Sequence, residues 1–217
     1  MPVGTIPFMV ARPGIDADVR ASILAAAIRT IEEEGLAGVS MREVARRAGV
    51  SHQLPYHYFT DREGILAAIA EAGFVELGAE LRSVAHGPGT AAERFAACGR
   101  VYVAFACAHP AHFRVMFRPD FVALDRHPGA QQCADDAFAI VPEIAAALVA
   151  EGLPPEPNEQ ALVVLAWSLC HGLACLLLDG PLSKKLPGVE AAKEQTIGDV
   201  MIAMQRLVER SSRRPRG

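Results

Sequence analysis

A run of hydrogen-bonding side chains lies between residues 51 and 62, SHQLPYHYFTDR. The Gln53 amide carries a donor and an acceptor side by side, which match the pair of groups that adenine presents in the major groove of DNA. His52 can donate to guanine in the same groove, whereas Leu54 offers an apolar contact, for example to a thymine methyl. The chemistry that this run suits is the reading of base edges in a duplex.

Neighbouring side chains could hold the phosphate backbone without choosing a sequence. The hydroxyls of Tyr56 and Tyr58 can donate to phosphate oxygens, and the Arg62 guanidinium can pair with them. We therefore expect duplex DNA to contact ten residues, which are Ser40, Arg42, Ser51, His52, Gln53, Leu54, Tyr56, His57, Tyr58 and Arg62.

A helix should begin at Met41 and lead into this run. Ser40 is followed three residues later by Glu43, which is the capping-box pattern of a helix N-terminus. Gly49 should end the helix, because glycine tolerates the left-handed conformation that a sharp exit needs. The expected element is therefore a short helix that stops just before the polar run.

A second short helix is expected over residues 52–58, with Ser51 as its cap. Pro55 would occupy the fourth position after Ser51 and would forfeit one backbone hydrogen bond. Thr60 and Glu63 repeat the capping-box pattern, so a further helix should start near residue 61. Its inward-facing residues would be Ile65, Leu66 and Ile69.

Residues 16 to about 70 resemble the DNA-binding domain of the TetR family of bacterial transcriptional regulators. The first helix of that family would run from Asp16 to Glu34, where apolar residues recur at helical spacing and Gly35 ends the run. The family pattern of a tyrosine, a variable residue, an aromatic or histidine and a phenylalanine reads here as Tyr56, His57, Tyr58 and Phe59, followed by the basic Arg62. The resemblance implies a helix-turn-helix that reads an operator.

The resemblance extends through the rest of the chain. HPAHFRVMF at residues 109–117 and WSLCHG at 167–172, continued by LACLLLDGPL, are similar to the TetR subgroup whose C-terminal domain is named for its tryptophan, histidine and glycine. It implies a repressor that binds a palindromic operator as a homodimer and is released by a small-molecule effector. Nothing in these residues selects the effector or the operator sequence.

The distribution of charge supports this interpretation better than its sum. The net charge is −4, yet residues 40–62 contain four arginines and only two acidic residues. The arginines are Arg42, Arg46, Arg47 and Arg62. Arg46 and Arg47 have an alternative role, because each could be solvated or paired with the acidic run at residues 32–34.

The segments after a linker at residues 86–89 all have helical periodicity, namely 90–107, 110–117, 131–151, 159–178 and 189–210. Aromatic and methionine side chains recur at helical spacing in the first two. We expect an effector pocket formed by Phe95, Tyr102, Phe105, Phe113, Met116, Phe117 and Trp167. The alternative is that these stripes are ordinary core.

The helix expected over residues 159–178 is apolar on nearly all sides and needs a cover. Together with residues 189–210 it could form a four-helix interface between two chains, where Gly172 would permit a close crossing. We expect His171, Gly172, Cys175, Met201 and Met204 at this interface. The predicted fold is all-α, with a helix-turn-helix DNA-binding domain over residues 14–70 and a larger effector-binding and dimerisation domain over 71–212.

Composition fits a soluble globular protein, since 51% of the 217 residues are hydrophobic and 21% are charged. The apolar run at residues 161–178 reaches membrane-spanning length but contains polar side chains and lacks basic flanks, so an interface helix is expected instead. The opening residues lack signal-peptide architecture, and the five cysteines form no CxxC pair. We expect a cytoplasmic protein without cofactor or metal.

Two other classes of function compete with this one. An enzyme would need a converging nucleophile and base, but Cys170 and His171 are adjacent on a helix and point about 100° apart. Pro110 interrupts the pair His109 and His112, so no catalytic site is expected. The remaining alternative is a protein-interaction adaptor or antagonist that has kept the fold without operator binding.

Overall fold

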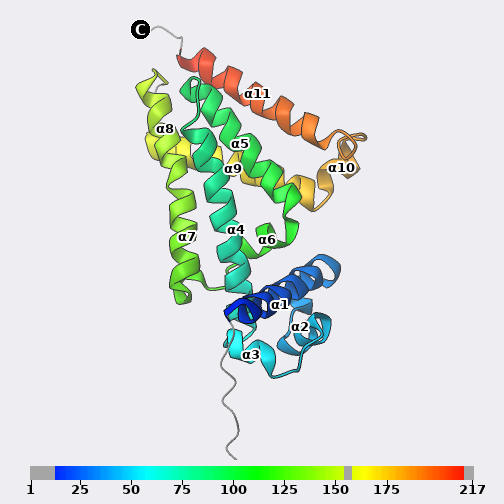
Figure 1. Cartoon of the computed structure of the whole chain (residues 1–217). Helices are drawn as coiled ribbons and strands as arrows, with labels where there is room; N and C mark the ends of the chain where they lie inside the picture. Colours follow the sequence, from blue (N-terminus) through cyan, green and yellow to red (C-terminus); the bar gives the residue numbers. More distant parts are fainter. Residues whose placement is uncertain (1–12, 154–157, 213–217) are drawn as a thin grey trace, which may run out of the picture. The chain divides into compact units, whose positions relative to one another are not determined.

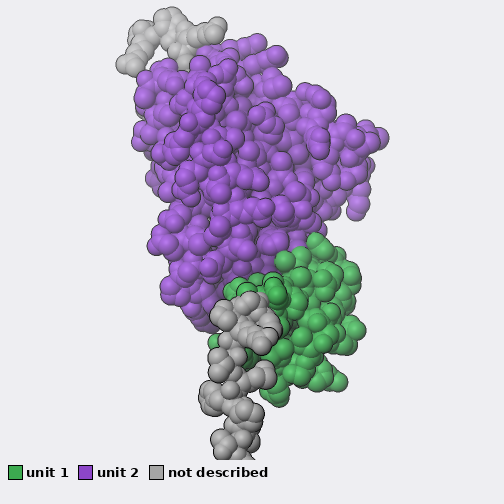
Figure 2. Space-filling view, viewed as in Figure 1, with its two compact units in different colours: residues 1–66 green, residues 67–217 purple. Residues whose placement is uncertain are grey.

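The computed structural model describes residues 13–153 and 158–212, and every regular element among them is a helix (Figure 1). The expected all-α class is therefore confirmed. The chain divides into two compact units, unit 1 over residues 1–66 and unit 2 over residues 67–217 (Figure 2). The division falls inside the long helix α4 (Arg62–Ala85), as does the boundary expected after residue 70.

Unit 1 consists of three helices and the first turn of α4. These are α1 (Pro13–Glu34), α2 (Met41–Ala48) and α3 (Leu54–Tyr58), with a 3-10 turn at Leu36–Gly38. Its core is formed by small and aliphatic side chains at helical spacing. Those with no exposed surface are Ile23, Ala26, Ala27, Ile31, Val44, Ala45, Ile65 and Leu66. Burial of each larger aliphatic side chain contributes about 1.5–3 kcal/mol to folding.

Helix α2 begins and ends as the sequence predicts. The Glu43 amide donates to Ser40 Oγ at 3.2 Å, and Gly49 has a left-handed φ of 70°. The Glu43 carboxylate accepts hydrogen bonds from the guanidinium groups of Arg46 and Arg47, which turns it away from a reciprocal capping role. The start of α2 is thus held by half of the expected capping box.

Helix α3 starts two residues later than predicted, at Leu54 instead of His52. Ser51 supplies its backbone carbonyl to the Leu54 amide at 3.0 Å, and the side chain of the helix cap, Gln53, makes no capping hydrogen bond. Pro55 is consequently the second residue of the helix. The expectation that it forfeits a hydrogen bond is wrong, because the first amides of a helix have no partner within it.

Helix α4 is capped by a different residue from the one predicted. The Gly64 amide donates to Asp61 Oδ1 at 2.8 Å, so Asp61 takes the role assigned to Thr60. Ile65, Leu66 and Ile69 are buried as expected. The error is one residue, since either side chain can serve as an N-cap.

Unit 2 contains the rest of α4, seven further α-helices and a 3-10 turn at Leu124–Arg126 among its described residues. The α-helices are α5 (Ala91–Ala108), α6 (Pro110–Met116), α7 (Pro128–Phe138), α8 (Ile140–Ala150), α9 (Glu159–Leu178), α10 (Pro181–Lys185) and α11 (Lys193–Ser212). Helix α5 lies centrally, packed against α8, α9 and α11 (Figure 1). The Thr90 and Glu93 capping box fixes its start.

The segment predicted as one helix over residues 131–151 is two helices that break at Ala139. Pro142 explains the break, because it lacks the amide that would donate to the Phe138 carbonyl and its ring collides with that carbonyl in a continuous helix. The last expected segment also differs. Helix α11 begins at Lys193, four residues after the predicted start, and the short α10 precedes it.

Helix α11 packs tightly against α5 at Gly99. A Cβ atom at Gly99 would collide with the Met201 sulfur, so the absence of a side chain at Gly99 permits this close approach. Met201 is fully buried and Met204 is 8% exposed within the single chain. These two side chains belong to the core of unit 2, which corrects the expectation that they lie on a surface between two chains.

Candidate functional site

The polar run before and along α3 lies on the surface of unit 1. Ser51, His52 and Gln53 are exposed in the turn that leads into the helix, and Tyr56 and His57 are exposed on the helix itself. Leu54 is half-buried. The opposite side of the same segment carries Pro55 and Phe59, which are buried. The segment is therefore anchored by its apolar side and presents its polar side chains to solvent.

Two of the expected phosphate contacts are engaged within unit 1. The Tyr58 hydroxyl donates to Asp16 Oδ1 at 2.9 Å, and burial is the main cause that raises the pKa of Tyr58. Arg62 donates to the Leu36 carbonyl at 2.6 Å. Tyr56, by contrast, is 54% exposed. The structure thus separates one outward tyrosine from a tyrosine and an arginine that stabilise the unit.

The arginines of α2 also divide into two roles. Arg47 binds Glu33 and Glu34 of α1 and Glu43 of its own helix, so it clamps α2 to α1. Arg46 is exposed and pairs with Glu43. The alternative role of pairing with the acidic run at residues 32–34 is confirmed for Arg47, whereas Arg46 pairs with Glu43 of its own helix instead. Arg42 is exposed beside the Ser40 cap.

These ion pairs set the charge state of Glu43. Hydrogen bonds from Arg46 and Arg47 lower the pKa of Glu43 to about 2. The carboxylate stays ionised at neutral pH and neutralises part of the arginine charge. The positive surface left for a phosphate backbone is smaller than the count of arginines suggests.

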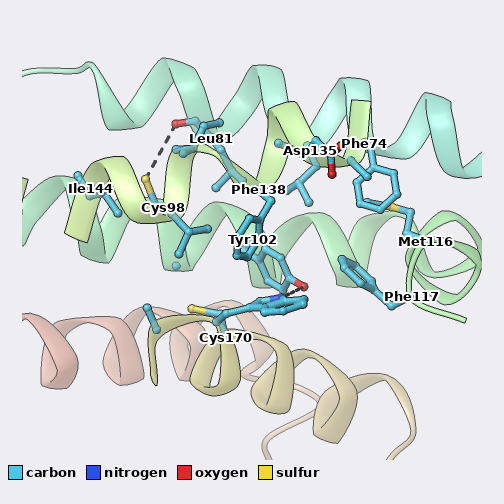
Figure 3. A pocket seen from close by; sticks show the side chains of 18 of the residues that line it. Phe74, Leu81, Cys98, Tyr102, Met116, Phe117, Asp135, Phe138, Ile144 and Cys170 are labelled. Carbon is cyan, nitrogen blue, oxygen red and sulfur yellow. Dashed lines mark hydrogen bonds between the residues drawn. The ribbon is translucent and has the colours of Figure 1, made fainter. Parts of the chain in front are cut away.

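Unit 2 contains a cavity of about 260 Å³ that is lined by residues of α4, α5, α6, α7, α8 and α9 (Figure 3). Five of the seven residues expected for an effector pocket line it, namely Phe95, Tyr102, Met116, Phe117 and Trp167. The other two, Phe105 and Phe113, are buried but do not reach the cavity. Phe105 packs on His109, and Phe113 on Tyr102 and His171.

Most of the remaining wall was missed from the sequence. It includes Phe74, Leu77 and Leu81 of α4, Phe138 of α7, Ile144 of α8 and Cys170 of α9. The α4 residues recur at spacings of three and four, which is the signal that could have revealed a second apolar face beyond the DNA-binding helices. The α7 and α8 residues could not be assigned because their helix was expected to be continuous.

A hydrogen-bonded chain closes one side of the cavity. Trp167 Nε1 donates to the Tyr102 hydroxyl at 3.3 Å, and this hydroxyl lies 2.9 Å from His171 Nδ1. The Tyr102 proton is directed to His171, since the indole can only donate. Burial raises the pKa of Tyr102 and lowers that of His171, so both side chains are neutral. The polar atoms of Trp167 and Tyr102 that face the cavity are therefore already hydrogen-bonded within the protein.

Helices α9 and α11 each carry apolar side chains that are exposed in the single chain. The exposed ones are Val164, Leu165 and Leu176 of α9 and Ile202 and Leu207 of α11. Gly172 is half-buried, and a Cβ added there would meet no atom within 4 Å. His171 and Cys175 are half-buried beside it. The close crossing expected at Gly172 is therefore not made within one chain.

The length and composition of α9 would let it cross a membrane, but one such helix is weak evidence and a third of the apolar window is buried inside unit 2. The five cysteines are free thiols. No group of three or more His, Cys, Asp or Glu side chains that could hold a metal ion was found in the part of the chain that the structure describes.

Two family models match separate parts of this chain. Residues 23–69 match the model described as bacterial regulatory proteins of the tetR family, and residues 95–200 match the tetracyclin repressor-like C-terminal domain. The subgroup named for tryptophan, histidine and glycine is not identified by either description and stays a prediction.

Transcriptional regulators of known sequence are similar to a short stretch of this chain. A BetI transcriptional regulator of Burkholderia thailandensis and one of Paraburkholderia phytofirmans are each 43% identical over 49 residues, which is 23% of this chain. The match spans about a quarter of the length of those regulators. The likeness to these regulators is thus confined to 49 residues of this chain.

Solved structures extend the likeness to the whole fold. A Rhodococcus sp. RHA1 protein of unknown function is 28% identical with a TM-score of 0.70, and the match covers 97% of this chain and all of that one. The fatty acid degradation regulator FadR of Bacillus halodurans has a TM-score of 0.67 at 12% identity over 87% of this chain and 93% of its own. The TetR family regulator PfmR of Thermus thermophilus gives 0.64 at 16%, over 85% and 97%. At these lower identities the likeness concerns the fold alone.

Proposed function

We propose that this chain, a member of the TetR family of bacterial regulatory proteins, represses transcription by binding a palindromic operator as a homodimer and leaves the operator when a small molecule occupies its cavity. It is a transcriptional regulator with a helix-turn-helix DNA-binding unit. The observation that carries the proposal is the orientation of α3, whose apolar side is anchored while Gln53, Tyr56 and His57 face solvent.

The start of α3 and the turn before it would lie in the major groove. His52 and Gln53 are in the turn, so their side chains project from the end of the helix toward base edges. Gln53 suits adenine and His52 suits guanine. A good bidentate pair discriminates against a wrong base by about 1–3 kcal/mol.

Contacts with phosphate would come mainly from Tyr56 and Arg42, which are exposed. The hydroxyl of Ser40 already accepts from the Glu43 amide, but it keeps a proton to donate. The Tyr58 hydroxyl would have to exchange Asp16 for phosphate, and Arg62 already donates to the Leu36 carbonyl, so we assign both a stabilising role first and a phosphate contact second.

We infer that a second copy of the chain packs against the exposed apolar residues of α9 and α11. Two chains related by a two-fold axis would bury Leu165, Leu176 and Ile202, and Gly172 would let the two α9 helices approach closely. The same symmetry would place two α3 helices on two half-sites of a palindrome. A cytoplasmic location follows for a protein that works on the chromosome.

The cavity of unit 2 is the site that we assign to the effector. Its walls come from α4 and from the helices that lead to the proposed interface, so an occupant would bear on both. Since each α3 must meet its groove in register, a change in the spacing of the two copies would weaken specific binding.

The proposal can be tested with the DNA upstream of the chain's own gene. We expect two chains to bind each duplex. The preference for this fragment over a scrambled one should persist as the salt concentration is raised, whereas the affinity for both fragments should fall. Gln53→Ala should relax the choice of base at one position in each half-site. Equal affinity for the two fragments at every salt concentration would leave the adaptor role as the better account.

A further inference from the structure

We propose that the cavity of unit 2 takes an elongated apolar molecule that ends in a positive charge, with the charged end at a mouth marked by Asp135. The proposal deepens the effector role argued above and rests on it for the consequence of binding. Binding itself can be measured without DNA, so the two can fail separately.

The walls define an elongated space. On α4 they extend from Phe74 to Leu81, and on α5 from Phe95 to Tyr102. Seven residues of helix correspond to about 10 Å at 1.5 Å per residue. A volume of about 260 Å³ spread over that length suits a single alkyl chain or a row of two rings better than a compact globular molecule.

The floor offers nothing for a polar group to bind. It is formed by buried side chains such as Leu77, Leu81 and Ile144. The Tyr102 hydroxyl accepts a hydrogen bond from Trp167 and lies within hydrogen-bond distance of His171. No buried side-chain nitrogen or oxygen on the described walls lacks a partner. A polar group carried to the floor would therefore lose water without gaining a hydrogen bond.

The mouth has a different chemistry from the floor. Three wall residues are exposed, namely Asp135, Phe138 at 43% and Trp167 at 39%. The rings of Phe138 and Trp167 pack edge to face, with centroids 5.4 Å apart. Partly exposed aromatic rings on the same wall as a carboxylate would attract a cation through both the ring quadrupoles and the ion pair.

The same wall disfavours an anion. Of the residues that the structure describes around the cavity, Asp135 alone carries a side-chain charge at neutral pH, and no lysine, arginine or histidine lines it. A carboxylate at the mouth would face Asp135, and a carboxylate at the floor would be buried unpaired. A carboxylic acid is therefore the wrong class of occupant.

Three probes of nearly equal size test this charge preference, namely octylammonium, octan-1-ol and octanoate. Trp167 is the single tryptophan of the chain and lines the cavity, so its fluorescence reports binding directly. None of the three probes absorbs at the wavelength that excites indole. We expect octylammonium to bind on the order of tenfold more tightly than octanoate, with octan-1-ol between them.

A matched pair of variants assigns the preference to one carboxylate. Asp135 accepts a hydrogen bond from the side-chain amide of Gln131 at 2.8 Å, and Asp136 accepts one from the side-chain amide of Gln132 at 2.8 Å. Of these two aspartates, only Asp135 lines the cavity. Asp135→Asn should reduce the ratio of octylammonium to octanoate affinity by about fivefold. Asp136→Asn should leave the ratio at its original value.

The inference is overturned if none of the probes changes Trp167 fluorescence, if octanoate binds as tightly as octylammonium, or if the two variants lower the ratio equally. Binding in the expected order with no change in operator affinity would support the inference and defeat effector release. Operator binding by a chain that ignores all three probes would defeat the inference and leave the proposed operator binding in place.

Discussion

The hydroxyl of Tyr58 donates a hydrogen bond to Asp16, 42 residues earlier in the chain, at an oxygen–oxygen distance of 2.9 Å. This bond ties the end of α3 to the start of α1. The neighbouring Tyr56 does not make this hydrogen bond and is 54% exposed. Two tyrosines that look equivalent in the sequence therefore have separate roles.

The first prediction compares Tyr56→Phe with Tyr58→Phe. Tyr56→Phe should weaken binding to all DNA sequences alike, by about 1 kcal/mol or fivefold, because it removes a phosphate contact and no base contact. Tyr58→Phe should instead lower the free energy of unfolding, because the hydrogen bond to Asp16 is lost. Fluorescence anisotropy on operator and scrambled duplexes, with denaturant unfolding alongside, separates the two. A Tyr56→Phe protein with an altered base preference would contradict the assignment.

The second prediction concerns acid unfolding and Glu43. The folded pKa of about 2 lies below the usual value of 4.5, so the carboxylate stabilises the fold above pH 4.5 and loses that contribution as the pH falls toward 2. Glu43→Gln should be less stable than the original chain at pH 7 and should lose less stability across that window. Denaturant unfolding at a series of pH values measures this.

Glu32→Gln is the control for Glu43, because Glu32 is exposed on α1 next to the two glutamates that Arg47 binds. It should give the pH profile of the unaltered chain. Identical profiles for Glu43→Gln and the unaltered chain would show that the clamp between α1 and α2 does not depend on this carboxylate.

Local signals in the sequence predicted unit 1 well and the cavity only in part. Ser40 and Gly49 act within a few residues of themselves, so α2 could be placed to the residue. The start of α3 could not, because Ser51 uses its backbone where a side-chain cap was expected. The break at Ala139 follows from Pro142 alone, a signal that the apolar periodicity of the segment obscured.

Burial was harder to predict than helix position. Met201 and Met204 fall on an apolar stripe of α11, and sequence periodicity cannot tell whether such a stripe faces its own chain or another. The answer depends on Gly99, 102 residues earlier, which lets α11 approach α5 closely enough to bury both methionines. Tertiary contacts of this range leave no trace in one sequence.

The third prediction uses the open surroundings of Gly172. Within one chain an alanine there meets nothing and should favour the helix by about 1 kcal/mol, so Gly172→Ala should not destabilise a monomer. Gly172→Leu should drive two copies apart or misalign them, and operator affinity should fall with it. Sedimentation at several concentrations measures the assembly. An intact Gly172→Leu dimer with unchanged operator affinity would place the interface elsewhere.

The fourth prediction tests the wall of the cavity with two buried aromatics of α5. Tyr102 lines the cavity and Phe105 does not, although both are at most 8% exposed. Tyr102→Ala should change the affinity for octan-1-ol several-fold. Phe105→Ala should leave that affinity alone while it lowers the free energy of unfolding by about 3–5 kcal/mol. Equal effects on octan-1-ol binding would mean that the probe occupies another site.

The most direct test of the account is to titrate octylammonium into the chain alone and into its complex with operator DNA, following Trp167 fluorescence. If the cavity controls DNA binding, operator must weaken octylammonium binding by the same factor by which octylammonium weakens operator binding. We predict a factor of roughly 5 to 150, which corresponds to a coupling of about 1–3 kcal/mol. Equal octylammonium affinity in the two titrations would contradict the account.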